Sequence, residues 1–161
     1  MARLDRCLVE PVAANLTRAK VARSCPCLGY AVADQDGTGE FITVTEGFTQ
    51  MSGLSGSYDE NMLKRAPENP HHKETTIEVL TKSLNGISEE AGFEYPDFVS
   101  LDIEGSELSA LQRFPFSDHR VGISAIQDNI GIREIVELMR GNDYELTDFC
   151  GPDEIYACRK N

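Results

Sequence analysis

Apolar residues follow two different spacings along the chain. Short apolar runs without helical spacing predict buried strands, whereas apolar residues at i, i+3, i+4 and i+7 predict amphipathic helices. Strands are predicted at residues 6–10, 27–33, 41–45, 75–80, 98–103, 121–126, 144–149 and 154–158. Helices are predicted at residues 11–23, 60–65, 83–91, 106–114 and 132–140. This alternation is typical of an α/β domain whose mostly parallel sheet carries helices on both faces.

Two turn sequences and one long loop refine this topology. Asp36-Gly37-Thr38-Gly39 predicts a hairpin that joins strand 27–33 to strand 41–45. A second hairpin, around Gly151-Pro152-Asp153, predicts that the last strand is antiparallel. The stretch 47–72 is longer than ordinary connections, which is typical of a loop with a functional role.

The length and charge of the chain limit its possible functions. Its 161 residues are enough for a single domain, spanning 1–161, with a core that needs neither disulfides nor metal. The formal net charge is −12 and Lys and Arg do not cluster, so nucleic acid is not an expected partner. The same charge disfavours anionic membrane surfaces, and no apolar stretch approaches the roughly 18 residues of a membrane-spanning helix.

The cysteines indicate a reducing compartment. There are five, an odd number, and the first 20 residues lack the uninterrupted apolar segment of a secretory signal. We therefore expect free thiols and a cytoplasmic protein. Cys25-Pro26-Cys27 is too closely spaced for the usual zinc knuckle, so no cysteine metal site is expected.

The segment 97–108 carries the strongest functional signal. It begins as an apolar strand and ends as a helix, with Gly105 permitting a sharp turn and Ser106 able to cap the helix. Side chains alternate along a strand, so Asp102 and Glu104 are expected on the same side, roughly 6.6 Å apart. Open α/β sheets bind ligands beyond the carboxyl ends of their strands. The two acids could hold a reacting hydroxyl, act as a general base or bind a divalent cation; alternatively, they only cap the helix.

The same segment resembles the signature of the FkbM-type methyltransferases: Asp97-Phe98-Val99-Ser100-Leu101-Asp102-Ile103-Glu104-Gly105-Ser106-Glu107-Leu108. Weaker similarity extends over residues 7–160, at Val9-Glu10-Pro11, Ala31-Val32-Ala33-Asp34, Ser52-Gly53-Leu54, Tyr144-Glu145-Leu146 and Asp153 to Lys160. The resemblance implies a Rossmann-like methyltransferase sheet, mostly parallel with a terminal antiparallel strand. It also implies methyl transfer from S-adenosylmethionine to a hydroxyl of a sugar- or polyketide-like acceptor, either a small molecule or a glycan.

Two residues are candidate cofactor ligands by this resemblance. Glu10, at a strand end before Pro11, would accept hydrogen bonds from the ribose hydroxyls of S-adenosylmethionine. Its alternative role is that of a surface acid favoured by a helix N-terminus. Asp34 would approach the adenine, or it would only start the turn that follows.

Catalytic and substrate-binding roles are implied as well. Asp102 and Glu104 would be the catalytic pair, and a divalent metal between them is an open possibility. The family often has Glu-[His/Asn]-Asn at the end of its fifth strand, where this chain carries Asp128 and Asn129 after a glutamine. Both of these residues are candidate substrate contacts. Glu107 is predicted to act only as an acid in the first turn of a helix, stabilising its dipole by a few tenths of a kcal/mol.

The start of the chain predicts a departure from the family. Nucleotide-binding units place a glycine-rich loop about 20 residues before the ribose-binding acid. Only nine residues precede Glu10, so we expect the chain to begin inside the domain, after the first strand and helix. The strands ending at Glu10 and Glu104 should then flank a vacant slot or pair directly. A vacant slot would expose strand edges and favour self-association.

Two other function classes fit the residues. One is a pseudoenzyme or binding module that keeps the fold without the cofactor. The other is a metal-dependent hydrolase that uses Asp102 and Glu104 as ligands. A hydrolase should depend on divalent metal and show no thermal shift with S-adenosylhomocysteine, whereas a methyltransferase should show that shift.

Overall fold

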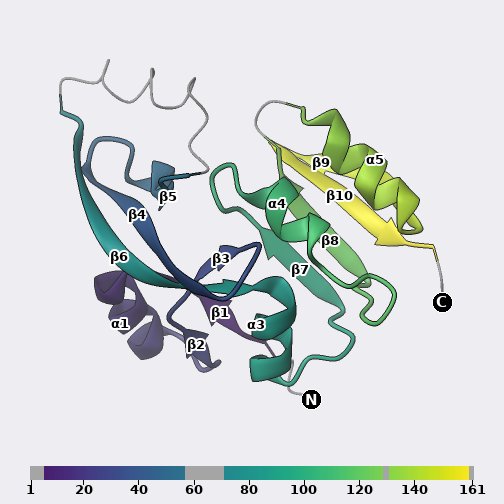
Figure 1. Cartoon of the computed structure of the whole chain (residues 1–161), viewed down its shortest axis with the longest axis horizontal. Helices are drawn as coiled ribbons and strands as arrows, with labels where there is room; N and C mark the ends of the chain where they lie inside the picture. The colour runs from purple at the N-terminus through teal and green to yellow at the C-terminus, as the bar shows by residue number, and fades with distance from the viewer. Residues whose placement is uncertain (1–5, 57–70, 129–130, 160–161) are drawn as a thin grey trace.

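The computed structural model describes residues 6–56, 71–128 and 131–159 (Figure 1). The strands are β1 (Leu8–Val9), β2 (Cys27–Leu28), β3 (Ala31–Ala33), β4 (Gly37–Glu46), β5 (Gly53–Leu54), β6 (Lys73–Ser83), β7 (Phe98–Leu101), β8 (Ile123–Gln127), β9 (Tyr144–Cys150) and β10 (Asp153–Cys158). The helices are α1 (Ala13–Ala22), the 3-10 turn η1 (Thr49–Met51), α3 (Leu84–Ala91), α4 (Glu107–Gln112) and α5 (Arg133–Gly141). The helix predicted at 60–65 lies outside the described residues.

The described strands form three sheets of mixed direction. Their orders are β1-β2, β3-β6-β4-β5 and β7-β8-β10-β9. The pairs β1–β2, β3–β6 and β7–β8 are parallel, and the remaining pairs are antiparallel. The α/β class and the antiparallel last strand are therefore confirmed. A mostly parallel sheet is not confirmed, because the long β4 runs antiparallel to β6.

The hairpin predicted at residues 36–39 is wrong. In the sheet β6 lies between β3 and β4, so the two strands do not pair with each other. The corner between them is instead attached to the end of β6: Asp36 accepts hydrogen bonds from the backbone N–H and hydroxyl of Ser83, at 2.9 and 3.0 Å. Gly39 belongs to β4, and a Cβ there would lie 3.2 Å from the side chain of Thr81. The glycines thus allow two strands to approach closely rather than form a two-residue turn.

The strand predicted at 27–33 is divided between two sheets. Its first part, β2, pairs with β1, and its last part, β3, pairs with β6. The ladder between β1 and β2 ends with the bond from the Glu10 N–H to the Leu28 carbonyl, at 3.0 Å. Alternate residues of β1 donate to β2, and the next donor in that series, the Val12 N–H, binds the Glu10 carboxylate instead, at 2.8 Å. A Cβ on Gly29 would lie 2.9 Å from the Leu16 side chain, so a larger residue there would require Leu16 of α1 to move.

The main core lies between the sheet β7-β8-β10-β9 and the helices α4 and α5, which lie against one face of it (Figure 1). Both helices bury the residues that their apolar spacing predicts, because these residues recur on one side of each helix. The buried cluster consists of Leu101, Leu111, Ile126, Ile135, Met139, Tyr144 and Tyr156. This packing holds the carboxyl end of β7 in a well-defined position.

In the described part of the chain, β1 and β7 are both edge strands. The strand with Leu8 pairs with β2 alone, and the strand with Leu101 pairs with β8 alone. Direct pairing between them, one of the two arrangements expected from the sequence, does not occur. Separately, no helix among the described residues has both the length and the apolar character that crossing a membrane requires.

Candidate functional site

A cavity of about 750 Å³ lies where β1 and β7 end. Glu10 follows β1 and enters its wall from one side, and Asp102 and Glu104 enter from the turn after β7. Residues of α1, β3, β4, η1 and β5 complete the lining. The structure thus brings Glu10 together with two candidates that lie more than 90 positions later in the sequence. Ligand binding at the carboxyl ends of strands is the arrangement that an open α/β sheet favours.

Glu104 is a buried acid in an unusual backbone conformation. Its φ is 54°, in the left-handed region that residues other than glycine rarely adopt, and Gly105 follows with φ 100°. The residue is only 7% exposed. Loss of water, followed by repulsion from the carboxylates of Asp102 and Glu107, raises the pKa of Glu104 to about 7. Near neutral pH this group can therefore both hold and release a proton.

Asp102 lines the same cavity but remains exposed to solvent. Protein atoms around its carboxylate displace enough water to raise its pKa, and repulsion from Asp153 acts in the same direction. Asp153 begins β10, which pairs with β8 next to β7. The sequence showed Asp153 only as part of a hairpin turn, so its proximity to Asp102 depends on the strand order.

Glu107 has a different role from the one predicted for it. Its carboxylate accepts hydrogen bonds from the Ile103 N–H at 2.8 Å and the Gly105 N–H at 2.9 Å. The residue is 3% exposed and belongs to the first turn of α4. The helix cap predicted for Ser106 is wrong, because its side chain makes no capping hydrogen bond. Glu107 thus stabilises the turn before the helix rather than only the helix dipole.

Glu10 combines the two roles that the sequence left open. It lines the cavity, and its Oε1 accepts a hydrogen bond of 2.8 Å from the Val12 N–H just before α1. That bond is what an acid near a helix N-terminus commonly makes. It uses one carboxylate oxygen and orients the side chain at the cavity wall.

Asp34 and Asp128, two of the remaining candidates, do not line this cavity. Asp34 follows β3 and is absent from the lining, although its neighbours Ala31 and Val32 contribute to it. Asp128 follows β8, and its carboxylate accepts hydrogen bonds from the Gly131 and Ile132 N–H groups before α5. Asn129 lies outside the described residues. The ligand roles of these three residues stay predictions.

Several further polar residues that the sequence did not single out also line the cavity. Thr43 comes from β4, Thr49 and Gln50 come from η1, and Arg18 comes from α1. The predicted loop 47–72 thus contributes ordered residues to the site. Arg18 follows Ala14 by one helical turn, so both lie on the same face of α1, and both line the cavity.

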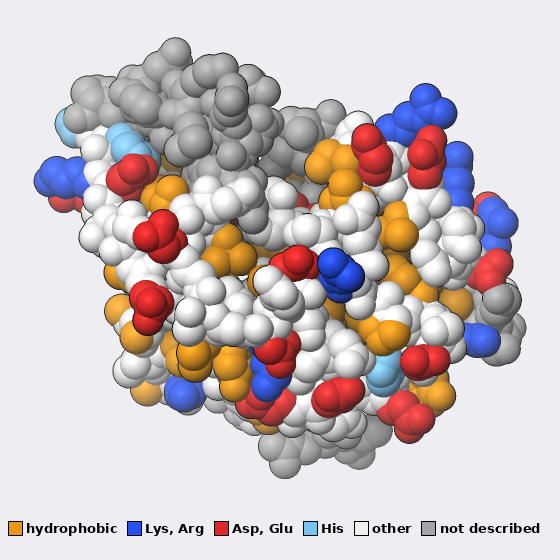
Figure 2. All heavy atoms as spheres, in the orientation of Figure 1, with side chains coloured by type: hydrophobic (Ala, Val, Ile, Leu, Met, Phe, Trp, Pro, Cys, Tyr) orange, Lys and Arg blue, Asp and Glu red, His pale blue; other side chains and the backbone are white. Residues whose placement is uncertain are grey.

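Negative charge dominates the cavity. Among the described residues, its lining contains three carboxylates, those of Glu10, Asp102 and Glu104, and one basic side chain, that of Arg18. Acidic side chains are also scattered over the visible surface of the molecule (Figure 2). A ligand that carries a positive charge or many neutral hydroxyls fits this environment better than an anion does.

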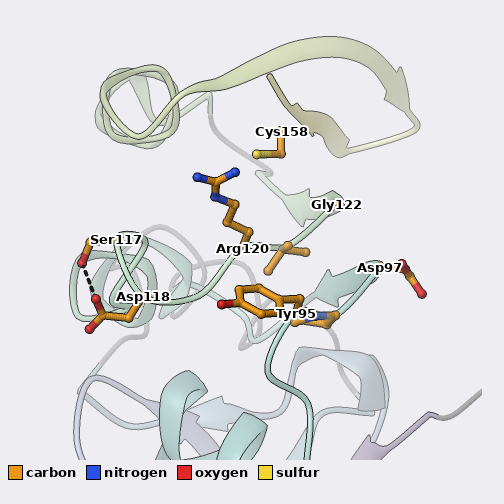
Figure 3. Close-up of a pocket in the computed structure, with 9 residues that line it drawn as sticks. Tyr95, Asp97, Ser117, Asp118, Arg120, Gly122 and Cys158 are labelled. Carbon is orange, nitrogen blue, oxygen red and sulfur yellow. Dashed lines mark hydrogen bonds between the residues drawn. The ribbon is translucent and has the colours of Figure 1, made fainter. Parts of the chain in front are cut away.

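A second pocket of about 430 Å³ lies at the opposite end of β7 and β8 (Figure 3). The ring of Tyr95 lies beside Arg120, whose side chain extends toward Cys158, while the Asp97 carboxylate points away from them. None of the residues predicted for catalysis lines this pocket. The carboxyl-end cavity is therefore the candidate active site.

The sequence that builds this site matches a known protein family. The family model described as the methyltransferase FkbM domain matches residues 4–149. The chain belongs to the FkbM methyltransferase family. The match includes Glu10 and the whole turn from Asp102 to Glu107, but it ends in β9, so the similarity suggested for residues 153–160 lies beyond it. Neither a curated protein nor a solved structure matches the chain.

The family suggests methyltransferase chemistry, for which S-adenosylmethionine is the typical methyl donor. The described residues of this FkbM family member contain no group of three or more His, Cys, Asp or Glu arranged to hold a metal ion. The hydrolase that would use Asp102 and Glu104 as metal ligands stays a prediction.

Proposed function

We propose that this FkbM family member is an S-adenosylmethionine-dependent O-methyltransferase whose acceptor is a hydroxyl of a sugar- or polyketide-like molecule. The observation that carries the proposal is that Glu10, Asp102 and Glu104 line one cavity at the carboxyl ends of two strands. The sulfonium of S-adenosylmethionine is positively charged, and the acidic lining would attract it. The protein would work in the cytoplasm, where thiols stay reduced.

The strand orders support a Rossmann-like arrangement. In this proposal β1-β2 and β7-β8-β10-β9 are two parts of one methyltransferase sheet, and one further strand belongs between β1 and β7. Both strands have a vacant hydrogen-bonding edge in the described part of the chain. The cavity at their carboxyl ends would then lie at the centre of the complete sheet.

S-adenosylmethionine supplies an activated methyl group, so the residues of the chain mainly align the acceptor and handle its proton. Glu10 would accept hydrogen bonds from the ribose hydroxyls. Glu104, whose pKa is about 7, would take the proton of the acceptor hydroxyl as that oxygen bonds to the methyl carbon and the carbon–sulfur bond of the donor breaks. Asp102 would hold that hydroxyl in line with the methyl group. Thr49 and Gln50, which also line the cavity, would contact the rest of the acceptor.

Calorimetric titration with S-adenosylhomocysteine tests the use of this cofactor. Glu10→Ala should weaken binding by about 10- to 100-fold, because the hydrogen bonds from the ribose hydroxyls to the Glu10 carboxylate would be lost.

Glu134→Ala is the matched control for that substitution, because Glu134 is an exposed acid in the first turn of α5. It should leave the affinity unchanged. Absence of binding would contradict the proposal and favour the binding module without cofactor. Hydrolysis that depends on added divalent metal, without a thermal shift by S-adenosylhomocysteine, would favour the hydrolase.

A further inference from the structure

The turn between β7 and α4 directs Glu104 into the cavity with a backbone conformation that costs energy. A non-glycine residue at φ 54° is disfavoured by about 1 kcal/mol or more relative to the ordinary regions. Such a conformation persists only where surrounding contacts maintain it. The contacts that maintain it should therefore be found on the peptide groups next to Glu104.

Those contacts come from a single side chain. The N–H groups of Ile103 and Gly105, on either side of Glu104, donate to Oε1 and Oε2 of Glu107 respectively. A carboxylate accepts hydrogen bonds at both oxygens, whereas an amide side chain accepts at one and donates at the other. Because Glu107 is 3% exposed, water cannot easily replace it as the acceptor.

We propose that Glu107 is a positioning residue, which holds the turn by these two hydrogen bonds and so fixes the direction in which the Glu104 carboxylate enters the cavity. Glu107 itself is absent from the cavity lining, so it acts through Glu104 and not on a ligand. The consequence for methyl transfer rests on the proposed function of Glu104. The structural part of the inference does not.

Two substitutions separate geometry from charge. Glu107→Gln keeps the size of the side chain but can accept only one of the two hydrogen bonds. Glu107→Asp keeps the charge but is one methylene shorter and cannot reach both N–H groups. If the two hydrogen bonds, and not the negative charge of Glu107, hold the turn, both variants should change the backbone chemical shifts of Glu104. Both should also speed amide hydrogen exchange at Ile103 and Gly105 by at least tenfold. Glu134→Gln, an exposed first-turn acid of α5, is the control and should change none of these signals.

A double-mutant cycle tests the coupling to the strained backbone. Glycine adopts positive φ without penalty, so Glu104→Gly removes the strain that Glu107 maintains. In the wild-type background, loss of the Glu107 bonds releases that strain and partly offsets the destabilisation. The urea midpoint should therefore fall further on Glu107→Gln in the Glu104→Gly background than in the wild type. Additive effects would overturn the inference.

A measurement on the unaltered protein keeps the test valid if the variants fail to fold. The amides of Ile103 and Gly105 should exchange no faster than core amides of β8. Fast exchange at both would overturn the inference. In an active form, Glu107→Gln and Glu107→Asp should lower kcat at least tenfold while the KM for S-adenosylmethionine changes less than threefold. If the wild type transfers no methyl group, the proposed function fails, and the exchange data still decide the role of Glu107.

Discussion

At the scale of residues, the candidate site contains one acid, Glu104, whose surroundings and backbone conformation are energetically unfavourable. Glu104 is buried, lies near two other carboxylates and has a left-handed backbone conformation. Each of these features costs folding free energy, and proteins concentrate such costs at functional sites. Asp102, two residues earlier, is solvent-exposed and has fewer carboxylates around it. In the proposed reaction the two acids would therefore have different tasks, with Glu104 removing the proton and Asp102 binding the hydroxyl.

The pKa of Glu104 predicts a pH-dependent stability. The folded value of about 7 exceeds the ordinary 4.5, so between these values the folded state holds a proton that the unfolded state has released. The free energy of unfolding should therefore fall as the pH rises from 4.5 to 7. Glu104→Gln carries no such proton. The difference in the free energy of unfolding between Glu104→Gln and the wild type should therefore shift in favour of the variant by up to about 3 kcal/mol from pH 4 to pH 8.

Urea unfolding at pH 4, 6 and 8 measures this difference. The same pH dependence in the wild type and in Glu104→Gln would show that the Glu104 carboxyl does not titrate abnormally. In an active form, the rate of methyl transfer should rise with pH through about 7, because the proton acceptor must be ionised.

Asp102 gives the corresponding prediction for turnover. Asp102→Asn should lower the methyl-transfer rate about 10²-fold or more, as expected when a group that binds the reacting hydroxyl is lost. Its stability should change little, since the side chain is exposed. Asp97→Asn, at the other end of β7, is the matched control and should keep the wild-type rate. Unchanged turnover in Asp102→Asn would leave Asp102 with a structural role only.

At the scale of elements, short segments between strands position the cavity walls. The corner after β3 is held by hydrogen bonds between Asp36 and Ser83, and Ser83 also caps α3 by accepting the Gly86 N–H at 3.1 Å. The same residue thus connects β6, α3 and the start of β4. Beyond that corner, β4 continues to Thr43, which lines the cavity.

Ser83→Ala should therefore destabilise the protein more than an ordinary surface serine substitution. Loss of a helix N-cap costs about 1 kcal/mol, and the bond to Asp36 is lost with it. Ser88→Ala is the control, because Ser88 lies within the same helix and donates to the Leu84 carbonyl. Alanine is favourable there, so this variant should unfold at a urea midpoint near that of the wild type. Equal midpoints for the two variants would contradict the capping role.

At the scale of the whole molecule, the sheets leave apolar surface and strand edges uncovered. β7 is an edge strand whose Phe98 is 58% exposed, and its partner in register, Ile123, is 45% exposed. Unpaired edges with apolar side chains favour association between chains. The expected partner in this case is a second copy of the chain.

Sedimentation at increasing protein concentration tests this expectation. The wild type should associate, and Phe98→Lys should shift the distribution toward the monomer, because a charged edge residue opposes strand addition. Val21→Lys provides the control, since Val21 is 87% exposed but lies on α1. A wild type that stays monomeric at every concentration would exclude association through this edge.

The order of elements follows largely from the sequence, because the spacing of apolar residues reflects the face that each strand or helix buries. The helices α4 and α5 were predictable from this spacing, whereas the antiparallel β10 and the turn after β7 were predictable from their turn residues. The family motif also singled out Asp102 and Glu104. These features are local, and each depends on residues within about one element.

Only the tertiary structure decided how the strands pair and which acids meet. The predicted β3–β4 hairpin is wrong because hydrogen bonds from β6 hold the corner after β3. Asp36 accepts a hydrogen bond from the Ser83 N–H, and the Thr81 hydroxyl donates to the Gln35 carbonyl at 3.1 Å. The residues of the corner and those of β6 lie about 45 positions apart in the sequence. The sequence did not reveal the two hydrogen bonds of Glu107 either. An acid in the first turn of a helix is already expected there, because it stabilises the helix dipole. A residue's type limits which hydrogen bonds it can make, but the packing of distant segments determines which partner reaches it.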